Sequence, residues 1–526
     1  MEMRNDVAAT LFNLPTYSAQ HIRAFRRHPD RTAFSWDGGS MSYGTANRMI
    51  GGMQAVFAGL GFSPGSCVSL LSSNRADAWC AGTAALASRF MTTWLHPLGA
   101  LADQIHQIED SGARVLIVDP EAFATRGEEL MALASGLETI FTLGPASFGI
   151  DLLAEVERVG AYSPRCLGEP EDVATLYYTG GTTGKPKGVF RRNRQMANMA
   201  AASLVNFELP AIPRYLAASP ISHVASAKLL PTWIRGGSVH LLKSFDAGKV
   251  LAAIEKERIN LALFVPTMVY ALLEHPQLET TDTSSLELML YGAAPMSPTR
   301  LEEALGRFGQ IFSQLYGQSE CYPITVLSRA DHDLARPERL FSCGFPATGC
   351  DIRLIGDDGA EVAPGEAGEI CVRSTQAMSG YWKQPEQTEA VIQDGWLHTG
   401  DVAKQDDEGF LYIVDRKKDM IVSGGFNIYP REVEDVLSSH PDVSSVAIIG
   451  VPDEKWGEAV LAVVVPREGR AVAPEALQDW VRQHKGSLMT PKSVEFVSEL
   501  PMTPIGKIDK KAVRSRFWKG RERQVG

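Results

Sequence analysis

The sequence predicts a layered α/β protein, with a large N-terminal body of α/β sheets, a small β-barrel-like subdomain and a small C-terminal α+β domain. Three observations support this fold class. The 526 residues exceed the length at which one hydrophobic core stops growing, so the chain is expected to divide. Strand-like and helix-like patterns alternate over more than half of the chain. Closely spaced turns between short strands then replace this alternation.

The alternating region supplies the large body. Helical patterns are expected at Ser18 to Arg27 and Tyr43 to Leu60. Short apolar runs rich in β-branched residues predict strands at Arg31 to Trp36, Cys67 to Leu71, Arg114 to Val118, Thr139 to Leu143, Ser238 to Leu242, Leu261 to Val265 and Leu286 to Tyr291. Because strands separated by helices join as parallel neighbours, we expect parallel sheets covered by helices.

The remaining chain shows two different patterns of predicted secondary structure. Turns beyond Phe341 separate short strands and predict a β-rich subdomain over about 341–415, within a large domain of residues 1–415. Residues 416–526 predict a separate α+β domain. Its expected elements are a helix at Pro430 to Ser438, strands at Val443 to Gly450 and Glu458 to Pro466, a helix at Pro474 to Lys485 and a strand at Ser493 to Phe496. With no low-complexity linker, the boundary should be a short hinge near 415–418.

Charge and cysteine content exclude several classes of protein. A net charge of −11 and a pI of about 5.6 disfavour nucleic acid as a partner. The basic stretch from Lys507 to Arg523 is expected to be a solvated terminal helix and a frayed end. Seven widely spaced cysteines fit reduced thiols better than disulfides or a metal knuckle. Without a signal peptide or transmembrane segment, a cytoplasmic protein is expected.

The segment Tyr177 to Val189, YYTGGTTGKPKGV, is suited to binding phosphate. Its glycines let backbone N–H groups approach an anion, its threonine hydroxyls donate further hydrogen bonds, and its lysines supply charge. A nucleotide P-loop is excluded, because it needs one more residue between its glycines and Ser or Thr directly after the lysine, where Pro186 stands. We predict that Thr179, Gly180, Gly181, Thr182, Thr183, Gly184 and Lys187 contact phosphate.

This segment resembles the phosphate loop of the adenylate-forming superfamily of acyl-CoA and aryl-CoA synthetases, adenylation domains and luciferases. The resemblance continues in order through YGAAP at 291–295, LYGQSE at 315–320, WLHTGD at 396–401, DRKKDMIVSGGFNIYP at 415–430 and PMTPIGKIDKK at 501–511. Ser319 stands where the family more often has Thr, which keeps the hydroxyl. The resemblance implies an AMP-forming ligase that uses ATP, Mg²⁺ and coenzyme A, with a mobile C-terminal domain.

The resemblance also implies roles for residues around the nucleotide. Gly292, Ala293 and Ala294 would lie beside the adenine, Tyr316 would stack on it, and Gly317 would also bind the nucleotide. Asp401 would accept both ribose hydroxyls, a task suited to a carboxylate, and Arg416 would reinforce the ribose or phosphate contact.

Three further residues are implied in catalysis. Ser319 would contact the α-phosphate and Glu320 would hold Mg²⁺, a hard cation that prefers oxygen ligands. Lys507 would bridge the substrate carboxylate and the α-phosphate, whose repulsion at 4 Å costs about 4 kcal/mol at an effective dielectric of 20. The neighbouring Lys510 and Lys511 are expected to be solvated.

The resemblance also implies which residues bind the substrate acid and the thiol. His223 matches the family's wall residue at the acyl pocket, where we favour a wall role over acid–base catalysis, and Phe264, Thr267 and Tyr291 are expected to line the same pocket. These walls carry no counter-charge for a substrate ammonium, so a fatty, aromatic or alicyclic acid is expected in place of an amino acid. Lys418 would be the hinge of the C-terminal domain. Ser423, Gly424, Gly425 and Asn427 would line the coenzyme A tunnel.

Two alternative functions remain open. An amide-forming ligase or a carrier-protein loader would share the first half-reaction and its motifs. A silent homologue that binds nucleotide only as a structural ligand is disfavoured by the presence of Lys507, Glu320 and Asp401. Beyond acid, ATP and coenzyme A, the expected partners include at most a second copy of the chain, as a homodimer.

Overall fold

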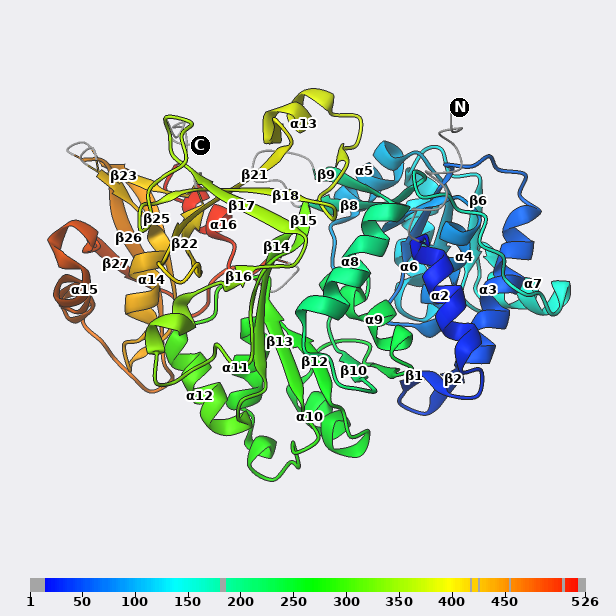
Figure 1. Ribbon diagram of the computed structural model, residues 1–526, viewed down its shortest axis with the longest axis horizontal. Coiled ribbons are helices and arrows are strands. Elements are labelled where there is room, and N and C mark those ends of the chain that lie inside the picture. Colours follow the sequence, from blue (N-terminus) through cyan, green and yellow to red (C-terminus); the bar gives the residue numbers. More distant parts are fainter. Residues whose placement is uncertain are drawn as a thin grey trace, which may run out of the picture.

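The protein is described here from a computed structural model that covers residues 15–179, 186–416, 419–423, 426–453, 456–503 and 507–518. Two large sheets and their helices form the body, and a further sheet with its helices lies at the end of the molecule coloured orange to red (Figure 1). The mixed α/β class is as the sequence predicts.

Within the described residues, the first large sheet has nine strands in the order β16-β15-β14-β13-β12-β10-β11-β1-β2. It is parallel from β14 to β1 and antiparallel at both edges, where β2 pairs with β1, β15 with β14 and β16 with β15. The strands are β1 (Thr32–Trp36), β2 (Gly39–Ser42), β10 (Arg214–Ala217), β11 (Ser238–Leu241), β12 (Leu261–Phe264), β13 (Leu288–Gly292), β14 (Phe312–Gln318), β15 (Cys321–Leu327) and β16 (Phe345–Pro346).

The second large sheet has eight strands over the same described ranges, in the order β19-β9-β8-β4-β3-β5-β6-β7. Only the pairs of β9 with β8 and β19 are antiparallel there. The strands are β3 (Cys67–Leu71), β4 (Met91–Trp94), β5 (Ala113–Val118), β6 (Thr139–Thr142), β7 (Ile150–Asp151), β8 (Val173–Thr179), β9 (Lys187–Arg192) and β19 (Gly380–Tyr381).

Helices cover both sheets, and the largest buried cluster joins side chains from the two sheets to those of the helices between them. Helices α8 and α9 lie between the sheets near the centre of the view (Figure 1). The helices are α2 (Tyr17–Arg27), α3 (Tyr43–Ala58), α4 (Ala76–Ala87), α5 (Leu101–Ser111), α6 (Pro120–Leu133), α7 (Leu152–Val159), α8 (Asn193–Asn206), α9 (Leu229–Ile234), α10 (Ala247–Lys256), α11 (Pro266–Leu273) and α12 (Pro298–Phe308), with 3₁₀ turns η1 (Val224–Lys228), η2 (Pro276–Glu279) and η3 (Pro337–Phe341).

A small antiparallel sheet follows, as the turn-rich texture beyond Phe341 predicts. Its strands are β17 (Cys350–Ile355), β18 (Gly368–Ser374), β20 (Ile392–Gln393), β21 (Trp396–Gln405) and β22 (Leu411–Arg416), with α13 (Pro385–Val391) beside them. Strands β21 and β22 pair so that Asp401 lies opposite Arg416.

The C-terminal sheet contains β23 (Ile421–Ser423), β24 (Phe426–Ile428), β25 (Val443–Asp453), β26 (Gly457–Pro466) and β27 (Ser493–Phe496), with α14 (Pro430–Ser438), α15 (Pro474–Met489) and α16 (Lys510–Ser515). Its two hydrophobic clusters contain only residues from Ile421 onward. In the part of the chain that the structure describes, no helix combines the length and the apolar character needed to cross a bilayer.

One expectation for the C-terminal helix is wrong. Lys510 is not solvated: its ammonium lies 2.7 Å from the Glu434 carboxylate, and both side chains are largely buried. Arg514 forms a similar pair with Asp419 at 2.7 Å. Lys511 is exposed, as expected. Helical periodicity explains the difference, because Lys510 and Arg514 share the face of α16 that packs on the domain.

Candidate active site

The described ends of the predicted phosphate loop form an antiparallel hairpin. Thr179, at the end of β8, pairs with Lys187, at the start of β9, so both predicted phosphate contacts flank the loop. The Lys187 ammonium lies 5.2 Å from the centre of the Tyr381 ring. The loop residues Gly180, Gly181, Thr182, Thr183 and Gly184 lie outside the described residues, and their roles stay predictions.

Glu320 lies close to this hairpin, in the turn between β14 and β15. The Tyr381 hydroxyl donates a 2.9 Å hydrogen bond to Oε1 of Glu320, so the ring that contacts Lys187 also orients the carboxylate. The guanidinium of Arg191, on β9, donates to the backbone carbonyl of the exposed Ser319. Burial lowers the pKa of Arg191. Two strands of the second sheet thus hold the turn that carries both predicted catalytic residues.

The surroundings of Glu320 indicate whether its carboxylate could bind a metal ion. No cluster of three or more His, Cys, Asp or Glu that could hold a metal is present among the described residues. Oε2 of Glu320 has no partner among those residues either. A single carboxylate with an available oxygen fits Mg²⁺, which commonly takes one or two carboxylates together with phosphate oxygens and water.

Close backbone packing distinguishes the predicted adenine loop. A Cβ on Gly292, at the end of β13, would overlap the Leu315 carbonyl oxygen, so only glycine fits there. Ala293 has φ of 64°, a left-handed conformation that is uncommon outside glycine. Ala294 follows, partly exposed. Gly317 lies in a register shift of β14, where a Cβ would come within 2.9 Å of the Cys321 carbonyl. Strained or crowded backbone of this kind often occurs at functional sites.

The side chains of Tyr316 and Arg416, from two other strands, contact the side chain of Asp401. Asp401 is 4% exposed, and its carboxylate accepts a 2.7 Å hydrogen bond from the Tyr316 hydroxyl at Oδ2. Arg416 Nε lies 3.0 Å from Oδ1. The Asp401 carboxylate raises the pKa of Arg416, and burial together with Asp401 raises the pKa of Tyr316, so both stay protonated donors. The structure thus brings together the carboxylate predicted to bind the ribose, the tyrosine predicted to stack on the adenine, and the arginine predicted to reinforce these contacts.

Lys507 lies within the electrostatic influence of this group. Burial, together with the Arg416 guanidinium, lowers its pKa to about 8, while Asp401 acts in the opposite direction. The backbones of Thr503 and Lys507 are joined by a 2.7 Å hydrogen bond. Segments that are remote in sequence therefore place the predicted catalytic lysine where the charges of Arg416 and Asp401 act on it.

His223 directly precedes η1 and contacts a second histidine. Its ring centre lies 4.4 Å from that of His96 in an edge-to-face arrangement, and its Nδ1 is 2.8 Å from the Ser222 hydroxyl. Burial, with a smaller effect of His96, lowers the pKa of His223 to about 3. The imidazole is neutral at neutral pH and unsuited to act as a general acid, which agrees with a wall role.

The other three predicted pocket residues do not converge with His223 on one cavity in the described structure. Phe264 and Tyr291 are fully buried among the side chains of α10, α11 and α12, because they alternate with strand residues that face the other large cluster. The Tyr291 hydroxyl lies 2.9 Å from Nε2 of His332. Thr267 is exposed on α11 and lines a hollow of about 190 Å³ against residues of the C-terminal sheet. Their pocket assignment stays a prediction.

The predicted tunnel and hinge residues are described only in part. Ser423 is buried at the end of β23, and Asn427 pairs with Val422 through its β24 backbone. Gly424, Gly425 and Lys418 lie outside the described residues.

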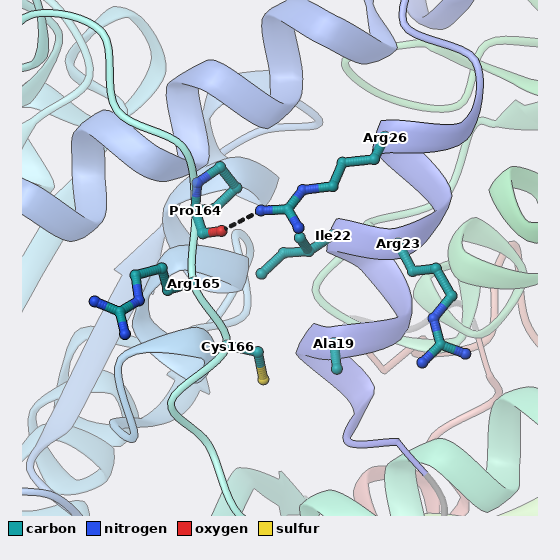
Figure 2. Close-up of a pocket in the computed structure, with 7 residues that line it drawn as sticks. All are labelled: Ala19, Ile22, Arg23, Arg26, Pro164, Arg165 and Cys166. Carbon is teal, nitrogen blue, oxygen red and sulfur yellow. Dashed lines mark hydrogen bonds between the residues drawn. The ribbon is translucent and has the colours of Figure 1, made fainter.

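A larger hollow of about 370 Å³ lies elsewhere, between α2 and residues 164–166. Arg26 donates to the Pro164 carbonyl across it, whereas the Arg23 and Arg165 side chains point away in opposite directions (Figure 2). None of the residues predicted to bind nucleotide, acid or thiol lines this hollow, so we assign it no part in the chemistry.

Sequence reasoning missed His96, Arg191 and Tyr381, each of which contacts a predicted site residue. The sequence held a signal for Arg191. Arg191 lies two residues after the buried Val189 in β9, and side chains two residues apart in a strand point to the same face of the sheet, so Arg191 had to face inward. Tyr381 had no comparable signal, because its contacts depend on the pairing of β19 with β9.

Comparison with known proteins now adds to this geometry. The AMP-binding enzyme family matches residues 22–382, and the AMP-binding enzyme C-terminal domain matches residues 432–507. The chain belongs to the AMP-binding enzyme family. As a member of the adenylate-forming superfamily it is an AMP-forming enzyme, in the branch of acyl-CoA and aryl-CoA ligases, for which ATP and coenzyme A are substrates.

Relatives within the AMP-binding enzyme family match from end to end. The medium/long-chain-fatty-acid–CoA ligase FadD8 of Mycobacterium tuberculosis is 44% identical over 540 residues, 99% of this chain and 94% of the relative. A feruloyl-CoA synthase of Amycolatopsis is 38% identical over 94% of this chain and 98% of its own length. The structure of the amide bond synthetase McbA from Marinactinospora thermotolerans superposes with a TM-score of 0.89 at 35% identity, covering 95% of this chain and all of the other.

Proposed function

We propose that this protein activates an apolar carboxylic acid with ATP, releases pyrophosphate, and transfers the acyl group from acyl-AMP to coenzyme A. The support from the structure is that Arg416 pairs with Asp401 and that the charges of both act on Lys507, three residues that the sequence analysis assigned to one nucleotide. Support from the relatives is that FadD8 and feruloyl-CoA synthase are named for fatty and aromatic acids. Fatty, aromatic and alicyclic acids all remain within this proposal.

In the first step, an oxygen of the substrate carboxylate attacks the α-phosphorus, and the bond to pyrophosphate breaks. Both reactants are anions, so the protonated Lys507 would lower the barrier by lying between them. Asp401 would hold the ribose, with Tyr316 and Arg416 fixing the carboxylate. When bound, Mg²⁺ would supply positive charge to the phosphates, and Glu320, oriented by Tyr381, would be its protein ligand.

In the second step, the thiol of coenzyme A attacks the acyl carbon, loses its proton and displaces AMP. We propose that residues 416–526 rotate as a small domain against residues 1–415, with Lys418 as the hinge. This rotation would withdraw Lys507 and present the segment from Ser423 to Asn427 to the thiol. Such a change lets one site be assembled twice.

The variant Lys507→Ala tests the first step. It should abolish ATP–pyrophosphate exchange but spare thioester formation from supplied acyl-adenylate. Lys511→Ala is the matched control, because that lysine is exposed on the neighbouring helix, and it should leave both half-reactions unchanged. Equal loss of both half-reactions in Lys507→Ala, or loss of neither, contradicts the assigned role.

A second candidate is amide formation, favoured by the superposition on the amide bond synthetase McbA. An assay that supplies ATP, a panel of acids and either coenzyme A or amines separates the two by the mass of the product. We further propose a cytoplasmic location, supported by seven cysteines that are all free thiols. A homodimer stays a prediction that sedimentation of the purified protein tests.

A further inference from the structure

Lys228, the last residue of η1, is fully buried. It is the only charged residue between Arg214 and Arg235, histidine aside. Its ammonium lies 3.2 Å from the Ser203 hydroxyl and 3.7 Å from the centre of the Phe207 ring, both contributed by α8 and the residue that follows it. The Tyr322 ring, on β15, is centred 5.3 Å away. A lysine is thus enclosed by a hydroxyl and two aromatic faces.

No carboxylate among the described residues contacts this lysine, and burial lowers its pKa well below the usual range. Ser203 accounts for one of its hydrogen bonds, so further donor capacity is unused. The hydroxyl of Tyr322 is also buried and has no partner among the described residues. Unpaired buried polar groups are costly. The unpaired Tyr322 hydroxyl and the spare donors of the neighbouring Lys228 ammonium indicate a place where a ligand atom completes the hydrogen bonds.

The location connects this pair to the proposed acyl pocket. Lys228 is carried by the 3₁₀ turn that starts directly after His223. Tyr322 follows Glu320 by two residues, and a Cβ on Gly317 would lie 3.2 Å from its ring. The Tyr322 ring therefore lies close both to Gly317, on the nucleotide side, and to Lys228. An acyl group that extends from the α-phosphate toward η1 would reach these two side chains with its far end.

We propose that Lys228 and Tyr322 form the inner end of the acyl pocket and bind an oxygen acceptor, either a carboxylate or a ketone oxygen, on the substrate acid remote from the carboxylate that is activated. This inference rests on the proposed function and narrows its substrate class. Both side chains are covered in the structure, so binding requires the Tyr322 ring to turn. No hydrogen bond to a described residue holds its hydroxyl, so this rotation breaks none.

The test compares acids of equal chain length by kcat/KM for pyrophosphate release: an unsubstituted alkanoic acid, an oxo acid and an α,ω-dicarboxylic acid. The wild-type enzyme should favour one of the two substituted acids by roughly tenfold or more, since an unsubstituted chain leaves the buried donors unpaired. Which of the two reacts faster identifies the oxygen. Lys228→Met should remove the preference while retaining activity on the alkanoic acid, and Tyr322→Phe should reduce it.

Each other outcome has a defined meaning. An equal loss for all three acids in Lys228→Met identifies a structural lysine and overturns the inference, as does an unchanged ratio. If Lys228→Met does not fold, Tyr322→Phe decides, because it keeps the ring and removes only the unpaired hydroxyl. A wild-type enzyme that prefers the unsubstituted acid overturns this inference alone. If none of the acids causes the wild-type enzyme to release pyrophosphate, that result overturns the proposed function instead.

Discussion

The contact between Tyr316 and Asp401 gives a quantitative prediction for ATP binding. The variant Tyr316→Phe keeps the ring that is proposed to stack on adenine and removes the hydroxyl that donates to Asp401 at 2.7 Å. A hydrogen bond to a charged group contributes about 1.5–3 kcal/mol. Because one factor of ten corresponds to about 1.4 kcal/mol, the Kd for ATP should rise by roughly ten- to hundredfold.

The second variant, Asp401→Asn, removes the charge itself. Asp401→Asn also removes the ion pair with Arg416. Loss of that pair should contribute about 1 kcal/mol or less to the weakening of ATP binding, because the Arg416 side chain is 46% exposed and water replaces the lost partner. If Tyr316 acts through Asp401, then Tyr316→Phe in the Asp401→Asn background should weaken ATP binding much less than in the wild type.

Isothermal titration with ATP and with AMP measures all four proteins of this cycle. A coupling energy of about 1.5–3 kcal/mol between the two residues is expected. Additive effects would refute the reasoning, because they would show that the tyrosine hydroxyl contributes to ATP binding without orienting the carboxylate. AMP should show the same coupling as ATP, since both carry the ribose.

The remaining predictions concern three other groups. The kcat/KM for pyrophosphate exchange should fall as the pH rises through about 8, because Lys507 loses its proton there, and Lys507→Arg should remove this fall; the same fall in the arginine variant would contradict it. Lys510→Met should destabilise the protein by about 2 kcal/mol in thermal unfolding, because it leaves the buried Glu434 carboxylate without its counter-charge, whereas Lys511→Met should stay within about 0.5 kcal/mol. Glu320→Gln should raise the Mg²⁺ concentration needed for exchange, while an unchanged requirement would argue against Glu320 as the ligand.

Local patterns determined the boundaries of several elements of this chain. The strands Cys67–Leu71 and Ser493–Phe496 and the helix Pro430–Ser438 have the ends that the sequence predicts. Such ends follow from turn residues and from the period of apolar residues, both of which act over a few neighbouring positions. The ordered motifs likewise pointed to the family, because each is a short contiguous stretch.

Only the tertiary structure decided which side chains meet. The sequence predicts that Phe264 and Tyr291 line one pocket with His223, and it gave no sign that strand alternation and the covering helices bury both in one hydrophobic cluster. It treated Lys510 as solvated and passed over Lys228, because a lysine looks the same in sequence whether or not it is enclosed. The partners that enclose these groups come from segments distant in the chain. Their distances depend on how sheets and helices pack, and nearest-neighbour patterns in the sequence carry no record of that packing.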